Sequence, residues 1–227
     1  MKKLGADLTI ILPCAGNGRR MKSHGPKSLI QIEGEITVIQ KQLKILLGQF
    51  PKAEVIVIVG FQADKLIKHL PKNVKIVENE FFEDTSSVRS LALALRVASN
   101  TRLLIINGDI IFNNNTIKNL VGNESIVVVD SHNQIAKDKV GVNVIDSYAA
   151  HFAYGFQKKW AQIAYITNGE FPIFYNMCCD KDRKRVFIFE IFNNMIDKGA
   201  KLKCFEPKTM KVIEIDSFKD IQIAKGI

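Results

Sequence analysis

A glycine-rich and basic stretch, residues 13–30, directly follows a short apolar run at residues 8–12. Glycine lets a backbone turn sharply and lets its N–H groups approach an anion closely. Arginine and lysine add positive charge, arginine as a planar fork and lysine as a point charge. The residues that combine these properties are Gly16, Gly18, Arg19, Arg20, Lys22, His24, Gly25 and Lys27. A loop of this kind at the carboxyl end of a strand predicts a polyphosphate site.

Two common phosphate-binding loops do not fit this stretch. The dinucleotide fingerprint G-x-G-x-x-G, counted from Gly16, needs a glycine where the chain has Met21. The Walker A loop needs lysine after its last glycine, but Gly25 is followed by Pro26. The loop therefore belongs to another class of phosphate site.

Acidic residues follow two further apolar runs. Asp109 comes after Asn107 and Gly108 at the end of the run at residues 103–106, and Asp216 ends the run at residues 212–215. An acid at the carboxyl end of a central parallel strand faces the same crevice as the basic loop. Each signal is weak by itself, because Gly-Asp is common in turns and an aspartate beside a helix start often serves only that helix.

The elements that must position these residues alternate between strand and helix in the first half of the chain. Continuous apolar runs predict strands at 8–12, 54–59, 74–77 and 103–106, and helical spacing predicts helices at 37–47, 63–70 and 86–98. This alternation predicts an α/β fold, a three-layer α/β/α arrangement around a Rossmann-like, mostly parallel sheet.

The second half of the chain is less regular and predicts a smaller antiparallel region. Strands are expected at 125–129, 141–145, 149–156, 202–205 and 212–215, with helices at 186–198 and 217–224. We expect a single domain over residues 1–227, in which residues 1–122 form a nucleotide-binding half and residues 123–227 an acceptor-binding, closing half.

Composition narrows the class of protein. Of the 227 residues 47% are hydrophobic, which excludes a disordered tail. The net charge of +9 suits phosphate or nucleic-acid handling, although heavy use of lysine, isoleucine and asparagine throughout explains it equally well. The cysteines lack C-x-x-C spacing and the histidines lack i, i+4 spacing, which argues against zinc. With no apolar run of about 18–20 residues and no signal-peptide pattern, we expect a cytoplasmic enzyme.

Four separated motifs resemble those of the sugar-nucleotide-type nucleotidyltransferases, which have a GT-A-like fold, and most closely the phosphocholine-type cytidylyltransferases. The first is residues 15–21, AGNGRRM, followed by Pro26 and Lys27. The resemblance implies that this loop wraps the triphosphate and that Arg20 and Lys27 stabilise charge on the α-phosphate and pyrophosphate. The implied nucleotide-binding residues of the loop are Ala15, Gly16, Asn17 and Gly18, and Arg19 is expected to be a solvated surface charge.

Two motifs supply the carboxylates. The resemblance implies that Asp109 and Asp216 bind Mg²⁺, which prefers oxygen ligands and usually takes one or two carboxylates besides phosphates and waters. Asp220 is expected to serve the first turn of the following helix. The alternative for Asp216 is a helix-start residue without a metal.

The fourth motif, residues 78–91, resembles the segment beside the base and ribose in cytidylyltransferases. The resemblance implies nucleotide contacts by Asn79, Thr85 and Ser90, although Phe82 and Ser86 depart from the tyrosine and asparagine of the family pattern. The alternative is that Thr85 and Ser86 only cap a helix.

Acceptor recognition is the least defined part of the sequence. A cationic group such as choline is bound by aromatic faces with a carboxylate nearby, which makes Tyr154, Trp160 and Glu190 candidates. The alternative is that the aromatic residues pack in core strands; Trp160, next to Lys158 and Lys159, is the one expected to be least core-like.

The expected activity is a Mg²⁺-dependent cytidylyltransferase, which joins CTP to a small phosphorylated, phosphocholine-like acceptor and releases pyrophosphate. The alternative is a sugar-1-phosphate nucleotidyltransferase that uses UTP, dTTP or ATP. A GT-A glycosyltransferase is less favoured because the sequence Asp109-Ile110-Ile111 lacks an Asp-x-Asp motif, and a nucleotide sensor would not need the full charged set. We expect no nucleic-acid or membrane partner, and a homodimer is an open alternative.

Overall fold

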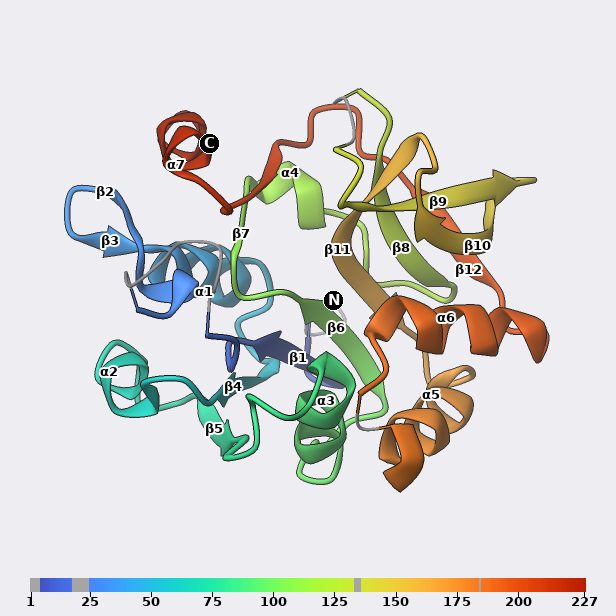
Figure 1. The fold of residues 1–227 in the computed structure, drawn as a ribbon, viewed down its shortest axis with the longest axis horizontal. Helices are drawn as coiled ribbons and strands as arrows, with labels where there is room; N and C mark the ends of the chain where they lie inside the picture. The colour runs from blue at the N-terminus through green and yellow to red at the C-terminus, as the bar shows by residue number, and fades with distance from the viewer. Residues whose placement is uncertain (1–4, 18–24, 133–135, 184) are drawn as a thin grey trace.

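The computed structural model describes residues 5–17, 25–132, 136–183 and 185–227. Its centre is a nine-stranded sheet with the strand order β5-β4-β1-β6-β11-β8-β12-β10-β9 (Figure 1). The expected α/β class with a mostly parallel half and an antiparallel half is confirmed.

The parallel half consists of strands that the apolar runs predicted. Strand β1 lies between β4 and β6 and is parallel to both, and β5 is parallel to β4 at the edge. Because helices cover both faces, these strands carry continuous apolar side chains and not an alternating pattern. Their bounds are Leu8–Pro13 for β1, Glu54–Val59 for β4, Lys75–Glu78 for β5 and Arg102–Ile106 for β6.

The other half is joined to the first through β11, Lys158–Ile166, a strand that the sequence patterns did not predict. Strand β11 runs antiparallel to β6 and β8, and β12 pairs parallel with β8. The outer strands β10 and β9 form an antiparallel pair, and β9 also contacts the start of β11. The bounds are Ser125–Asp130 for β8, Val140–Ile145 for β9, Tyr148–Tyr154 for β10 and Leu202–Phe205 for β12.

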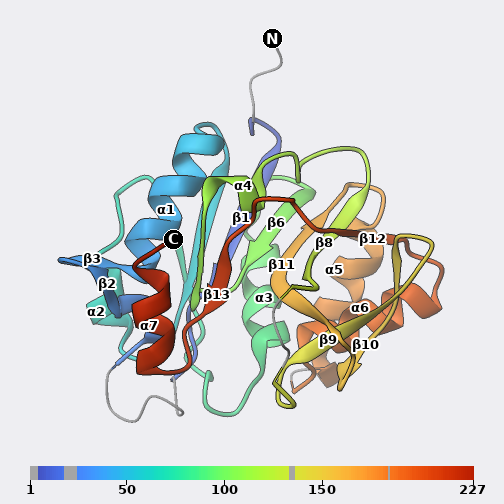
Figure 2. The same ribbon diagram turned by 90° about the horizontal axis from the view of Figure 1, so that it is seen from above.

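Helices cover both faces of this sheet, as Figure 2 shows. Apolar side chains of α1, α2 and α4 form one core cluster, and those of α3, α5 and α6 form the other. Helix α5 was not predicted, because its sequence is apolar on nearly every side and so lacks helical periodicity. The bounds are Val38–Gln49 for α1, Ala63–Ile67 for α2, Ser87–Leu95 for α3, Asn114–Ile117 for α4, Phe171–Cys179 for α5 and Ile188–Asp197 for α6.

Short elements bring the C-terminal segment back to the carboxyl end of the parallel strands. Strand β13, Val212–Glu214, pairs antiparallel with β7, Ile110–Phe112, and the Ile215 N–H donates to the Asp109 carbonyl over 2.8 Å. The remaining short elements are β2 (Gln31–Glu33), β3 (Ile36–Thr37), α7 (Phe218–Ala224) and the 3₁₀ helices η2 (Lys27–Leu29) and η3 (Lys181–Arg183). Among the helices of the described residues, none has both the length and the apolar character needed to cross a bilayer.

Candidate active site

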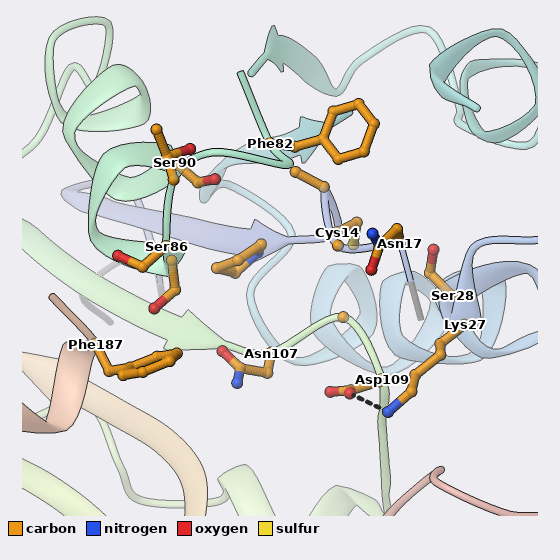
Figure 3. Close-up of a pocket in the computed structure, with 16 residues that line it drawn as sticks. Cys14, Asn17, Lys27, Ser28, Phe82, Ser86, Ser90, Asn107, Asp109 and Phe187 are labelled. Carbon is orange, nitrogen blue, oxygen red and sulfur yellow. Dashed lines mark hydrogen bonds and ion pairs between the residues drawn. The ribbon is translucent and has the colours of Figure 1, made fainter. Parts of the chain in front are cut away.

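A pocket of about 540 Å³ lies where β1 and β6 end and α3 begins (Figure 3). The loop after β1 supplies Ala15, Gly16 and Asn17 to its wall, and the segment after β6 supplies Asn107 and Asp109. Backbone hydrogen bonds hold the loop in place: the Cys14 N–H donates to the carbonyl of Ile58, and the N–H of Gly108 donates to the carbonyl of Pro13. The predicted crevice between the glycine-rich loop and Asp109 is therefore present.

Close approach of the two segments requires glycine at position 108. A Cβ atom there would lie 2.8 Å from the Pro13 carbonyl oxygen and 2.2 Å from the Cys14 Sγ. Any larger residue would push the loop after β1 away from Asp109. The glycine of the Asn107-Gly108-Asp109 sequence is thus a packing requirement of the site.

Lys27 lies at the start of η2 and its side chain points towards the carboxylates. Its Nζ donates to Asp109 Oδ2 over 3.1 Å, and it also forms a hydrogen-bonded ion pair with Asp216. Burial alone would lower the pKa of Lys27, but the two aspartates outweigh burial and raise it above its usual value. Lys27 is therefore a fixed positive charge at the pocket.

Three carboxylates converge beside Lys27. Oxygen atoms of Asp109, Glu214 and Asp216 lie within 4.8 Å of one another. Burial would raise the pKa of Asp216, but hydrogen bonds from Lys139 and Lys27 lower it well below its usual range. Burial, followed by the charge of Asp109, raises the pKa of Glu214. Carboxylate oxygens are the ligands that hard divalent cations prefer, so this donor set fits such an ion.

Glu214 and Lys139 belong to this cluster but were not among the predicted site residues. The Lys139 Nζ lies 2.7 Å from Glu214 Oε2 and also pairs with Asp216, and the Nζ of Lys159 lies 3.9 Å from the same Glu214 oxygen. Glu214 could have been found from its position two residues before Asp216 in the predicted 212–215 strand segment, because alternate residues of an extended chain share a face. Lys139 carries no comparable signal, because it precedes β9 in a turn far from both acids in sequence.

Asn79 supports the pocket from behind. It is buried, and its Nδ2 donates to Thr85 Oγ1 over 3.1 Å and to Ser90 Oγ over 3.0 Å. Thr85 and Ser90 line the pocket, whereas Asn79 fixes the turn between β5 and α3. The structure therefore brings Thr85 and Ser90 to the pocket, with Asn79 one layer behind them.

Two predicted residues of the loop, Gly18 and Arg20, lie outside the described residues, as does Arg19. Asp220 caps α7 as expected, because its Oδ2 accepts hydrogen bonds from the N–H groups of Asp216 and Ser217. This contact places Asp216 at the turn that enters the helix while its own carboxylate faces Lys27 and Lys139.

A second, smaller cavity of about 150 Å³ adjoins the first and shares Ser87, Asn107 and Phe187 with it. In Figure 3 Phe187 lies at the opposite end of the main pocket from Lys27. Lysines and aromatic side chains form much of the wall of the second cavity, together with Glu214: Lys139, Lys159, Tyr154, Trp160 and Phe189.

The three predicted acceptor residues differ in their surroundings. Tyr154 is 56% exposed and packs edge-on against Phe189. Trp160 was expected to be the least core-like aromatic residue, and this is wrong: it is 4% exposed and packs against Phe152 and Phe192. Side chains alternate along β11, so Trp160 points into the core while the lysine before it points to the carboxylates. The Glu190 carboxylate instead accepts the Phe187 N–H and caps α6, and the residues that line the two cavities do not include it.

Comparison with known proteins identifies the family. A family model described as the MobA-like NTP transferase domain matches residues 10–178, which is most of the chain. The chain belongs to this family. It contains a nucleotidyltransferase domain, as the motifs predicted.

The curated relatives align with only part of this chain. The bifunctional protein GlmU of Lactococcus lactis subsp. cremoris is 34% identical over 99 residues. The match covers 44% of this chain and 21% of GlmU, so the chain spans only about a fifth of the curated relative's length.

Solved structures match over nearly the whole chain at low identity. The CTP:phosphocholine cytidylyltransferase LicC of Streptococcus pneumoniae has a TM-score of 0.80 at 17% identity, covering 97% of this chain and 98% of LicC. The inositol-1-phosphate CTP transferase of T. maritima has a TM-score of 0.79 at 15% identity, with coverages of 98% and 96%. A putative glucose-1-phosphate thymidylyltransferase of Bacillus anthracis has a TM-score of 0.76 at 15% identity, with coverages of 96% and 94%. At these identities the likeness establishes the fold.

Proposed function

We propose that this nucleotidyltransferase joins CTP to a small phosphorylated acceptor and releases pyrophosphate, with Mg²⁺ as its cofactor. The observation that carries the proposal is that the carboxylate cluster of Asp109, Glu214 and Asp216 joins two cavities. Asp109 lines the main pocket, and Glu214 lines the second cavity, which also contains two lysines. A triphosphate in the first pocket and a phosphate in the second would meet beside the carboxylates.

The glycine-rich loop and Lys27 are suited to hold the triphosphate. Gly16 has open space where a Cβ would lie, so its backbone leaves room for phosphate oxygens. The Lys27 Nζ already lies among carboxylates, and a phosphate that enters the pocket adds a further anion to its surroundings. Lys27, with Arg20 from the same loop, would stabilise negative charge on the α-phosphate and on the leaving pyrophosphate.

Asp109 and Asp216 are the residues proposed to hold Mg²⁺, with Glu214 beside them. When bound, the ion would neutralise and orient the phosphates of the nucleotide. In the structure these acids pair with Lys27 and Lys139, so positive charge already surrounds the cluster.

The acceptor's phosphate oxygen is already an anion, so its attack on the α-phosphorus requires no general base. What the protein must supply is position and charge. Lys139 and Lys159 line the second cavity, within 2.7 and 3.9 Å of Glu214, and are proposed to orient the acceptor's phosphate.

The organic part of the acceptor would contact Tyr154, Phe187 and Phe189. The rings of Phe187 and Phe189 are stacked with centroids 6.0 Å apart, and Tyr154 meets Phe189 at 5.7 Å. Exposed aromatic faces attract a quaternary ammonium group, so a phosphocholine-like acceptor is proposed first. Support for CTP comes from the 78–91 segment, whose Thr85 and Ser90 line the pocket, and from the two CTP-using structural neighbours.

A sugar 1-phosphate with UTP, dTTP or ATP is the second candidate, because the structural neighbours include a putative glucose-1-phosphate thymidylyltransferase. One pyrophosphate-release screen separates the candidates. It crosses the four ribonucleoside triphosphates and dTTP with phosphocholine, phosphoethanolamine, phosphorylated polyols and several sugar 1-phosphates. We expect the largest kcat/KM for CTP with phosphocholine; a larger value for a sugar 1-phosphate pair would replace the first candidate by the second.

Substitutions test the residue roles in the same assay. Lys27→Ala and Asp109→Asn are each expected to abolish pyrophosphate release while the protein remains folded by circular dichroism. Lys159→Ala is expected to raise KM for the acceptor about tenfold or more and to leave KM for the nucleotide unchanged, since one charge-assisted contact is worth about 1.5–3 kcal/mol. Lys158→Ala is the matched control, because its exposed side chain is on the other face of β11. Full activity of both Lys27→Ala and Asp109→Asn would show that the site is assigned wrongly.

A further inference from the structure

A basic hollow of about 600 Å³ lies next to the catalytic pocket, on the outer side of the segment that leads into α3. Four cationic side chains line it, with a single acid, Asp84. They come from α3 and from the η3 region between α5 and α6: Arg89, Arg96, Lys181 and Arg185. None of these four is among the residues assigned to nucleotidyl transfer above.

The lysine-rich composition of the chain does not account for this cluster. The sequence contains 25 lysines but only seven arginines, and three of the seven arginines line this one hollow. Arginine presents a planar fork that matches phosphate oxygens in pairs, which lysine does not. Concentrated arginine therefore indicates a binding surface for phosphate groups.

The four cations have no acidic partners within the described part of the chain. Other arginines do: Arg102 pairs with Asp7 at 2.5 Å and Arg183 with Asp180 at 3.4 Å. Arg89 lies in α3 and Arg96 is its C-cap; they are seven residues apart, about two helical turns, and so lie on the same side of the helix. Like charges gathered around a concave surface raise the local positive potential and attract anions.

We propose that this hollow is a second binding site, for a nucleoside polyphosphate, separate from the catalytic pocket. Its volume is within the range of about 300–1,000 Å³ that is usual for small-molecule sites. Phe81, which also lines the hollow, is 60% exposed and offers a ring face on which a base can stack. The arginines would bind the phosphates, and Phe81 the base.

The hollow and the catalytic pocket meet at one residue. Thr85 lines both, and its hydroxyl donates to the Phe81 carbonyl while it accepts from Asn79. A ligand in the hollow would therefore contact the turn whose other side forms the wall of the catalytic pocket. The two sites are adjacent, but they use different cationic residues.

Calorimetric titration with ATP and with CTP, in the presence of Mg²⁺, tests the proposal by stoichiometry. We expect two CTP molecules per chain in the wild-type protein, one at each site, and binding of ATP at the second site. The double variant Arg89→Ala/Arg96→Ala should lose the second site, with its Kd raised at least tenfold, and should keep the pyrophosphate-release activity. The variant Lys27→Ala should retain the second site, so that failure of the proposed catalytic site and failure of this one are distinguishable.

Matched variants and ligands complete the experiment. Lys65→Ala/Lys68→Ala removes the same charge from exposed positions in α2 and at its C-cap, and this variant should still bind two CTP molecules. Arg89→Lys/Arg96→Lys keeps the positive charge but removes the planar guanidinium groups, so this variant should bind the second nucleotide more weakly. A single CTP site per chain that Lys27→Ala abolishes, or nucleotide binding that is unchanged in Arg89→Ala/Arg96→Ala, would overturn the proposal. Tighter binding of inorganic tripolyphosphate or of an acidic peptide than of either nucleotide at this site would overturn the nucleotide as its ligand.

Discussion

Replacement of Gly108 by alanine tests whether the candidate active-site pocket depends on the close approach of two loops. The added Cβ would lie 2.8 Å from the Pro13 carbonyl oxygen, 2.2 Å from the Cys14 Sγ and 3.2 Å from the Cys14 Cα. The Cys14 side chain is buried and the carbonyl is backbone, so neither can simply rotate away. The loop after β1 must therefore move by roughly half an ångström to an ångström, at a cost of about 1–3 kcal/mol for such overpacking.

The same movement separates the glycine-rich loop from Asp109. A misplacement of about 1 Å between groups that must cooperate costs about 100-fold in rate. Urea denaturation should show Gly108→Ala to be less stable, and the pyrophosphate-release assay should show its kcat/KM reduced by that order. KM for the nucleotide should rise in addition to the fall in kcat, because nucleotide binding uses the displaced loop.

Two comparisons make the Gly108 result decisive. Gly48→Ala, in α1 with open space at the Cβ position, should be about 0.5–1 kcal/mol more stable and fully active. Cys14→Ala/Gly108→Ala should recover only part of the loss, because the clash with the Pro13 carbonyl remains. If Gly108→Ala kept wild-type stability and activity, the reasoning from loop contact would be refuted.

Three further substitutions probe other parts of the fold. Glu54 accepts hydrogen bonds from Thr9 and Ser99 and pairs with Lys75; burial would raise its pKa, but these partners lower it from 4.5 to about 2. The ionised Glu54 carboxylate therefore stabilises the fold above about pH 4.5, and this contribution is lost as the pH falls towards 2. Glu54→Gln should lower the free energy of unfolding by about 1–2 kcal/mol at pH 7 and by much less at pH 3. Equal losses in urea denaturation at both pH values would contradict this. Trp160→Ala should cost about 3–5 kcal/mol in thermal denaturation because the indole is buried, whereas Tyr154→Ala should change stability by less than about 0.5 kcal/mol and raise KM for the acceptor. A stable Trp160→Ala protein would show that the ring is not part of the core.

The elements that sequence patterns predicted are those whose signal is local. Strands β1, β4 and β6 are continuous apolar runs, and α3 has a clear helical repeat of apolar residues that packs against them. Each of these elements has its own pattern of apolar residues and is bounded by its own turn residues. The parallel half of the sheet could therefore be predicted without knowledge of the other half. The glycine-rich loop and Asp109 follow directly from the same reasoning, since both leave the carboxyl ends of such strands.

Strand β11 could not be predicted in this way. It begins with two lysines, its Gln162 has a positive φ of 58°, and its pairing with β8 shifts between Trp160 and Ala164. This irregularity breaks the alternation that marks a strand, although β11 lies at the centre of the sheet. Helix α5 was missed for a related reason, because packing against α3 and α6 on several sides removes the polar face that reveals a helix.

Local sequence patterns are enough to predict the strand–helix alternation, the position of the glycine-rich loop and the motifs of the family, because each of these depends on residues that are close together along the chain. Only the folded chain shows that Lys139 and Glu214 join Asp216, that Trp160 packs in the core, and that three arginines from two distant segments line one hollow. The physical reason is that charges and rings act across space: a side chain's role depends on what the fold brings within a few ångströms of it, and neither spacing nor residue type records those neighbours.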